Sequence, residues 1–539
     1  MSLSTEQILL LNNLTYTYDN PMFSSNMSDY TNLSVADYIA AIESSGYRCE
    51  NDSSYMTQSD WRNIITAIKN DDTLMNVRIV TTHIDSKPPK GNGYSVIYAD
   101  NSSKEAVVCF KGTQSDEEWI DNFEGATSTN STDGVSTQCQ ENALEWYQES
   151  YDRYGLDEYS VTVTGHSKGG NKAKYVTIMD DSVDRCLSFD GQGFSDQFVD
   201  KYSDKIAQRK GVIENHNVDN DYVNILLNDV GEQHFYTGQD IGNGEGGFLE
   251  NHCPNSFFKF ENGSASMIES PNGRGEGLEE VDQLLNSILR SLPEEEQANM
   301  AQFMNEIRRG AFNGCKPDYF VNLILSEKYA GLVVYLMAYL TEYAGTSEMV
   351  DKVLTCIGGE DFKKAANVIV KLIQDEDFTK TIARVSTVGS VIPNSIIDKL
   401  LKLVKKHYGD DCEWVNAKNF KKTLAILYMI HAQRDKIKNT PNGKDRVIGS
   451  VIKNADFEVN VDSLFNASDR LKGIAEEIAR ISEDIRSCRF EQTIGVFANI
   501  KLNKHCQKLT NIFKSVNSMG SSIKSVGQTY KRIENKITS

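Results

Sequence analysis

The sequence lacks the cysteine and histidine patterns that mark metal sites and disulfide-stapled proteins. Its ten cysteines form no C-x-x-C pair, and its eight histidines include no H-E-x-x-H motif. A chain of 539 residues is also much larger than the usual disulfide-rich scaffold. We therefore expect free thiols in a reducing compartment and neither a metal site nor another cofactor.

Long apolar runs and positive charge are also scarce. The most apolar run, residues 330–341, is too short to cross a bilayer and predicts a buried helix. The first residues have neither the basic region nor the cleavage site of a Sec signal peptide, so synthesis in the cytoplasm without that signal is expected. The net charge of −20 argues against nucleic-acid binding, although it leaves a lipid substrate open.

Strand-like and helix-like segments alternate in the first half of the chain. Short runs rich in β-branched and aromatic residues predict strands at 94–98, 106–110, 160–164, 186–189 and 212–216. Helical patterns lie between them, as at 141–154 and 170–179. This alternation predicts βαβ units and a mainly parallel sheet with flanking helices.

Helical periodicity dominates after Gly277. Apolar residues repeat at spacings of three and four over 461–485 and again over 509–537, as in heptad seams, and a turn between them predicts an antiparallel helical hairpin. The two helices either pack only on each other or form a docking module for helical proteins. We expect three domains, which are an α/β domain (1–275), an all-α middle domain (276–450) and the hairpin (451–539).

A candidate nucleophile follows the strand predicted at 160–164. Ser167 lies in Gly-His-Ser-Lys-Gly, between that strand and a helix. The G-x-S-x-G pattern alone is weak, but a nucleophile elbow requires this strand–turn–helix context and small residues such as Gly165 and Gly169. The helix N-terminus would favour a developing oxyanion. The alternative is a glycine-rich turn with an ordinary serine.

Two aspartates are candidates for the acid of a catalytic triad. Asp219 and Asp221 both follow the strand predicted at 212–216, and an acid after the serine and before the histidine suits the chain order of an α/β hydrolase. Either aspartate could instead cap a turn or a helix.

Histidine is the expected base, because its side chain is basic near neutral pH. His252 lies in a loop before an apolar strand, the usual place for a catalytic imidazole, and His234 is the alternative. His216 precedes both acids and is expected inside a strand, whereas His166 is expected to be structural or to line the pocket.

The segment from Val107 to Asn122 resembles class 3 lipases. Its strand ends in Phe-Lys-Gly-Thr and is followed by Glu-Trp-Ile-Asp-Asn, similar to the F-R-G-T and D-W-x-x-N segments of that group. Lys111 replaces the arginine and Glu118 replaces the first aspartate. In class 3 lipases a lid lies where this chain has the polar stretch 125–138, which could equally be a plain surface loop.

Residues 189–194, Phe-Asp-Gly-Gln-Gly-Phe, more closely resemble the F-D-G-P-G-F signature of a bacterial lipase-like family, with Gln192 in place of proline. The resemblance covers roughly residues 30–265. It implies an α/β-hydrolase fold and a carboxylic ester hydrolase of lipase or phospholipase A type. It also implies that Asp221 is the acid, that His252 is the family's late histidine, and that Thr113 and the Lys168 N–H form the oxyanion hole.

The last helix carries Tyr530-x-x-x-Glu534, which resembles the export motif of WXG-type substrates of type VII secretion. With a terminal hairpin, the chain looks like a reversed LXG effector. This resemblance implies a bacterial secreted lipase, a toxin with small helical partner proteins and transient contact with a membrane surface. The alternatives are a cytoplasmic esterase, or an interaction scaffold with an inactive hydrolase domain.

Overall fold

The computed structural model describes most of the first 343 residues and isolated positions beyond them. The described ranges are 2–19, 30–44, 57–85, 93–113, 115–126, 133–239, 251–275, 278–292, 294–324 and 326–343, with 350, 351, 353, 354, 361–367, 370, 402, 430, 472 and 476. Residues 1–439 form one compact unit and 440–539 a second. The predicted hairpin, including Tyr530 and Glu534, lies outside the described residues except at positions 472 and 476.

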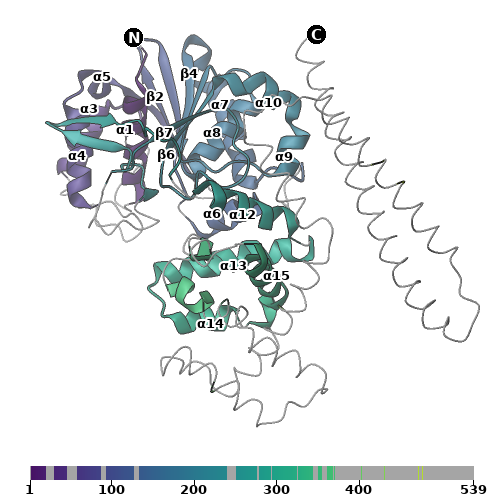
Figure 1. The fold of residues 1–539 in the computed structure, drawn as a ribbon. Coiled ribbons are helices and arrows are strands. Elements are labelled where there is room, and N and C mark those ends of the chain that lie inside the picture. Colours follow the sequence, from purple (N-terminus) through teal and green to yellow (C-terminus); the bar gives the residue numbers. More distant parts are fainter. Residues whose placement is uncertain are drawn as a thin grey trace, which may run out of the picture. The chain divides into compact units, whose positions relative to one another are not determined.

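A seven-stranded sheet lies at the centre of the first unit (Figure 1). Its strands follow one another in chain order: β1 (Arg78–Ile84), β2 (Tyr94–Asp100), β3 (Glu105–Phe110), β4 (Ser160–His166), β5 (Arg185–Phe189), β6 (Ile213–Val218) and β7 (Glu232–Tyr236). The pairings from β1 to β3 are antiparallel, and those from β3 to β7 are parallel. The prediction of a mainly parallel sheet is therefore confirmed. The five predicted strands correspond to β2–β6, whereas β1 and β7 were not predicted.

Alternate residues of β3 face opposite sides of the sheet, because strand side chains have a period of two. Val107 and Cys109 pack in a core with α1 (Thr5–Thr15), α3 (Val35–Ser44), α4 (Gln58–Lys69) and α5 (Asp72–Asn76). Val108 and Phe110 pack in a second core with α7 (Gln138–Tyr154) and α8 (Lys168–Met179). Helices thus cover both faces, and the parallel strands share one carboxyl edge.

Several smaller elements complete the α/β part. They are η1 (Tyr16–Asp19), α6 (Asp116–Glu124), η3 (Leu156–Glu158), α9 (Asp196–Lys201), α10 (Ser203–Arg209), η4 (Lys210–Val212) and the antiparallel pair β8 (Phe258–Glu261) and β9 (Ser264–Met267). The described cysteines, at 109, 139, 186, 253 and 315, form no disulfide bond.

Helices follow the α/β part, as the change of pattern after Gly277 predicts. They are α12 (Leu278–Ser291), α13 (Glu294–Phe312), α14 (Pro317–Ile324), η5 (Glu327–Tyr329) and α15 (Ala330–Tyr343), around a third core that also includes Ile225. The apolar run at 330–341 lies in α15 and is largely buried, as predicted. Of the helices described here, none has the length and apolar character needed to cross a membrane.

Candidate active site

Ser167 occupies a strained turn between β4 and α8. Its φ of 60° and ψ of −125° lie outside the regions that residues with a side chain ordinarily adopt. The turn brings backbones into close contact: a Cβ on Gly169 would lie 2.0 Å from the carbonyl oxygen of Phe110, and one on Gly165 would lie 2.2 Å from the carbonyl carbon of Gly169. Only glycine fits at these two positions, so the crowding on both sides holds Ser167 in its strained conformation.

This strain predicts a difference in stability between two variants of Ser167. Ser167→Gly should unfold with a free energy about 1 kcal/mol higher than Ser167→Ala, because glycine adopts this backbone conformation without steric cost. Urea denaturation of the two purified variants measures the difference. Equal stabilities, or a less stable glycine variant, would contradict the strain assigned to this turn.

His252 joins the serine to a buried acid. Its Nε2 lies 2.8 Å from Oγ of Ser167, and its Nδ1 lies 3.1 Å from Oδ1 of Asp221. Asp221 is completely buried and also accepts hydrogen bonds from the backbone N–H groups of Val223 and Asn224, both at 3.1 Å. Since a carboxylate can only accept, Nδ1 of His252 carries the proton and Nε2 is free to accept one from the serine hydroxyl.

The alternative acid and base lie elsewhere. Asp219 accepts hydrogen bonds from the backbone of Gly238 and from the hydroxyl of Ser270, at 3.3 and 3.1 Å. His234 lies in β7 and stacks on His216, with ring centroids 5.0 Å apart. These contacts place His216 in β6, His234 in β7 and Asp219 in the loop after β6, and none of them is a contact with Ser167.

His166 borders the site from the end of β4. Its Nδ1 lies 2.6 Å from the hydroxyl of Tyr16, and its ring centroid lies 4.8 Å from that of His252. Burial, followed by the repulsion of a positive His252, holds the pKa of His166 well below its usual value. A neutral imidazole here adds no positive charge beside the candidate base. The sequence around Tyr16 does not predict this contact.

The loop after β3 passes directly beside the serine. A Cβ on Gly112 would lie 3.4 Å from Cβ of Ser167, and the hydroxyl of Thr113 accepts a hydrogen bond of 2.8 Å from Nδ2 of Asn122 in α6. Lys168 begins α8, so its backbone N–H is one of the groups at a helix N-terminus that lack an intrahelical acceptor. The two predicted oxyanion donors therefore come from segments that flank the nucleophile.

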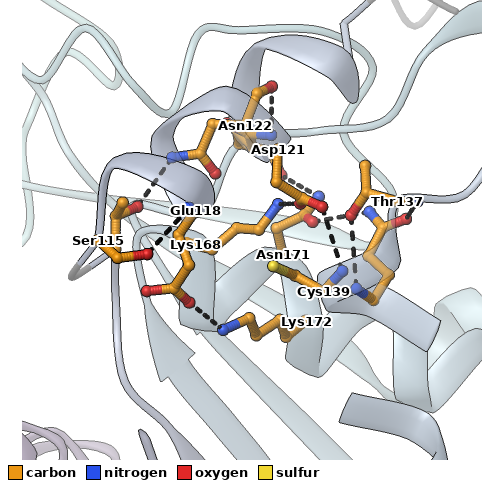
Figure 2. Close-up of polar contacts among 12 residues, drawn as sticks. Ser115, Glu118, Asp121, Asn122, Thr137, Cys139, Lys168, Asn171 and Lys172 are labelled. Atoms are coloured by element: carbon orange, nitrogen blue, oxygen red, sulfur yellow. Dashed lines mark hydrogen bonds and ion pairs between the residues drawn. The ribbon is translucent and has the colours of Figure 1, made fainter. Parts of the chain in front are cut away.

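Buried ion pairs connect α8 to α6 (Figure 2). The ammonium of Lys168 contacts the carboxylate of Asp121, and both side chains are fully buried. One turn along, Lys172 pairs with Glu118 at 2.8 Å. Asp121 also accepts a hydrogen bond of 3.1 Å from the backbone N–H of Cys139 in α7. The two ion pairs thus hold α8, which begins at Lys168, against α6. Asn122 in α6 in turn donates the hydrogen bond to Thr113.

One group of described side chains has the composition of a metal site. Nitrogens of His166 and His252 and a carboxylate oxygen of Asp190 lie within 4.8 Å of one another. Both ring nitrogens of His252 already have partners, Ser167 and Asp221. A metal ion would have to displace one of them, so this group fits a hydrogen-bonded site better than a metal centre.

The polar stretch 125–138 lies between α6 and α7 and is only partly described. Residues 127–132 fall outside the described residues. Beyond them, the Asp133 carboxylate accepts hydrogen bonds from the backbone of Val135 and Ser136, and Thr137 caps α7. The described end of the stretch is thus an ordered turn, and a lid in the remainder stays a prediction.

Comparisons with known proteins agree with a lipase-like domain. The model of the Mbeg1-like family, which is lipase-like, matches residues 73–225, and this segment carries Thr113, Ser167 and Asp221. Together with the mainly parallel sheet, it supports an α/β-hydrolase domain in this chain. His252 lies beyond the matched segment. No curated protein matches the chain significantly.

Similar solved structures are fungal lipases. A Rhizomucor miehei lipase propeptide complex is 14% identical, with a TM-score of 0.23. The match covers 34% of this chain and 66% of the lipase chain, just under two thirds of the lipase's length. Yarrowia lipolytica Lip2 lipase is 14% identical, with 40% and 86% covered and a TM-score of 0.24. A triacylglycerol lipase from Penicillium expansum is 13% identical, with 39% and 83% covered and a TM-score of 0.22. Matches with TM-scores this low carry no argument about individual residues. The roles of the residues are therefore argued from the geometry of this chain.

Proposed function

We propose that this protein is a serine-dependent carboxylic ester hydrolase that acts on lipids, with Ser167 as nucleophile, His252 as general base and Asp221 as the acid that orients the base. The continuous hydrogen-bonded series Asp221–His252–Ser167 is the observation that carries the proposal. A strained serine at the junction of a strand and a helix supports it, because this geometry exposes a nucleophile at the end of a sheet.

The chemistry follows from the positions of the hydrogens. His252 Nε2 takes the proton of Ser167 while the serine oxygen attacks the ester carbonyl, and Asp221 stabilises the imidazolium that forms. N–H groups of Thr113 and Lys168, with the Thr113 hydroxyl, would receive the negative charge on the carbonyl oxygen. The alcohol leaves with the proton from His252. Water, deprotonated by the same imidazole, then releases the acyl group as a carboxylic acid.

Asn122 is expected to act on this step through Thr113. Asn122→Ala removes the donor that holds the Thr113 hydroxyl, so kcat should fall about tenfold while KM changes little. Asn76→Ala, at an exposed position of α5, is the matched control and should retain full activity. Steady-state hydrolysis of a short-chain chromogenic ester gives both constants. An Asn122 variant with the wild-type kcat would remove Asn122 from the proposed oxyanion site.

Phospholipids or acylglycerols are the proposed substrates. The argument is the lipase-like family match together with the class 3 lipase resemblance around Thr113. Purified protein would be incubated with vesicles of phosphatidylcholine and with emulsified triacylglycerol, and the released fatty acid would be measured. Release that depends on Ser167 supports the proposal. Cleavage of soluble esters alone would instead favour an esterase without a lipid substrate.

We further propose that the chain is a bacterial type VII effector whose terminal helices bind small helical partners. The heptad seams and the Tyr530-x-x-x-Glu534 motif support this proposal. The test compares the full chain with Tyr530→Ala in the producing bacterium. Wild type found outside intact cells and the variant retained inside would support secretion. Retention of both would favour the cytoplasmic esterase.

A further inference from the structure

A second buried carboxyl group lies beside the proposed triad. Asp190 follows β5 directly, as Asp221 follows the neighbouring strand β6, so the shared carboxyl edge of the parallel sheet brings the two acids together. Asp190 is fully buried and has a φ of +46°, a conformation that aspartate and asparagine tolerate better than most residues. A fully buried carboxyl group beside the proposed triad needs a physical explanation.

The two oxygens of Asp190 have different surroundings. Oδ1 accepts hydrogen bonds from the backbone N–H of Val218 at 2.8 Å and from Nδ2 of Asn224 at 2.9 Å. Oδ2 is buried, and no donor among the described residues reaches it. Asn224 bridges the two acids, because its Nδ2 donates to Asp190 while its backbone N–H donates to Oδ2 of Asp221 at 3.1 Å. Two carboxylate oxygens can form a hydrogen bond only if one of them carries a proton.

The surroundings decide which acid holds that proton. Asp221 accepts three hydrogen bonds, from His252 and from the backbone of Val223 and Asn224, so both of its oxygens already act as acceptors. Asp190 forms no ion pair with a lysine or arginine among the described residues. The imidazole rings of His166 and His252 lie near it. Burial and the neighbouring Asp221 raise the pKa of Asp190 well above its usual value.

We propose that Asp190 is a neutral carboxylic acid that donates a hydrogen bond from Oδ2 to the Asp221 carboxylate, and thereby positions the acid that orients His252. Asp190 does not touch the reacting atoms and acts through Asp221. It supplies the fourth donor to a carboxylate that is otherwise held by the loop after β6 and by the imidazole. The kinetic part of this inference rests on the proposed ester hydrolase, whereas the protonation state of Asp190 does not.

Replacing Asp190 by alanine or by asparagine separates this role from simple packing. Asparagine can accept at Oδ1 from Val218 and Asn224 while its Nδ2 donates to Asp221, so it reproduces the proposed hydrogen bonds; alanine removes them. Asp190→Ala should lower kcat about 10- to 100-fold, the usual range for losing a hydrogen bond to a charged group. Asp190→Asn should keep most of the wild-type kcat. An asparagine variant as inactive as the alanine variant would overturn the proposal.

The pH profile gives a second kinetic readout. Without its fourth donor, the Asp221 charge is less dispersed and stabilises the protonated His252 more strongly. The acidic limb of kcat/KM should therefore move to higher pH in Asp190→Ala and return towards the wild-type position in Asp190→Asn. A role limited to filling space would lower activity without moving this limb, so an unshifted limb in the alanine variant also counts against the proposal.

Infrared spectroscopy tests the protonation state without any substrate. The difference spectrum of wild type minus Asp190→Asn should contain the carbonyl-stretch band of a protonated carboxylic acid. Recording at about pH 8 limits interference from Asp282, whose pKa burial raises to about 7. Asp200→Asn, at an exposed position of α9, is the control and should show no such band. A spectrum without the band overturns the inference, whether or not the protein cleaves esters. If the band is present, the protonation of Asp190 stands even if the protein cleaves no ester.

Discussion

Replacing Ser167 by alanine is expected to abolish ester hydrolysis, lowering kcat by at least about 10⁴-fold, because the variant has no hydroxyl to attack the carbonyl. The fold should persist, since alanine keeps the Cβ and loses only the hydrogen bond to His252. Hydrolysis of a short-chain chromogenic ester, with circular dichroism of the same samples, measures both properties.

Ser44→Ala is the matched control for this result. Ser44 is exposed at the end of α3, and its hydroxyl bonds only the backbone of its own helix, at the carbonyl of Ala41. This variant should keep wild-type activity. If Ser167→Ala hydrolyses the ester as fast as the control, another group performs the chemistry and the assignment of the nucleophile is wrong.

Breaking the buried ion pair of Asp121 and Lys168 is expected to have the largest effect on stability. Asp121→Ala leaves the Lys168 ammonium buried without its carboxylate and deprives the Cys139 N–H of its acceptor. The cost to the free energy of unfolding should be about 3–5 kcal/mol, as for other buried pairs that lose one partner. Urea denaturation of the variant and the wild type measures this cost.

A double variant separates the buried charge from the loss of packing. Asp121→Leu with Lys168→Met removes both charges and retains apolar volume, so it should be more stable than Asp121→Ala. Glu43→Ala breaks the exposed pair of Glu43 and Lys69 and should cost less than about 1 kcal/mol. A cost for Asp121→Ala as small as for Glu43→Ala would show that the buried pair does not hold α6 against α8.

Local sequence patterns were sufficient for the nucleophile turn and the central strands. The turn at Ser167 depends on neighbours in the chain, chiefly Gly165 and Gly169, so its motif contains the necessary information. The strands β2–β5 carry mostly apolar and β-branched side chains because they are buried by helices on both faces. The strand β7, Glu-Gln-His-Phe-Tyr, begins with three polar residues and is partly exposed, so only the residues around His234 indicate a strand there.

Contacts between distant segments could not be predicted in the same way. Lys168 and Lys172 are spaced like charges on a solvated helix face, and only the position of α6 shows that both are buried against acids. Asp190 lies in the Phe-Asp-Gly-Gln-Gly-Phe motif, which by itself assigns no role to the aspartate. The useful signal was an acid at the carboxyl end of the strand beside the nucleophile strand, but its partner Asp221 is 31 positions away.

Covalent labelling tests the central claim most directly. An alkyl phosphonate ester with a good leaving group reacts with a serine only when a base activates its hydroxyl and donors stabilise the phosphoryl oxygen. We predict that mass spectrometry of the labelled full chain finds one adduct, on Ser167, and that His252→Gln lowers its rate of formation at least about 100-fold. An adduct on another residue, or a rate that does not change in the histidine variant, would contradict a catalytic Ser167–His252 pair.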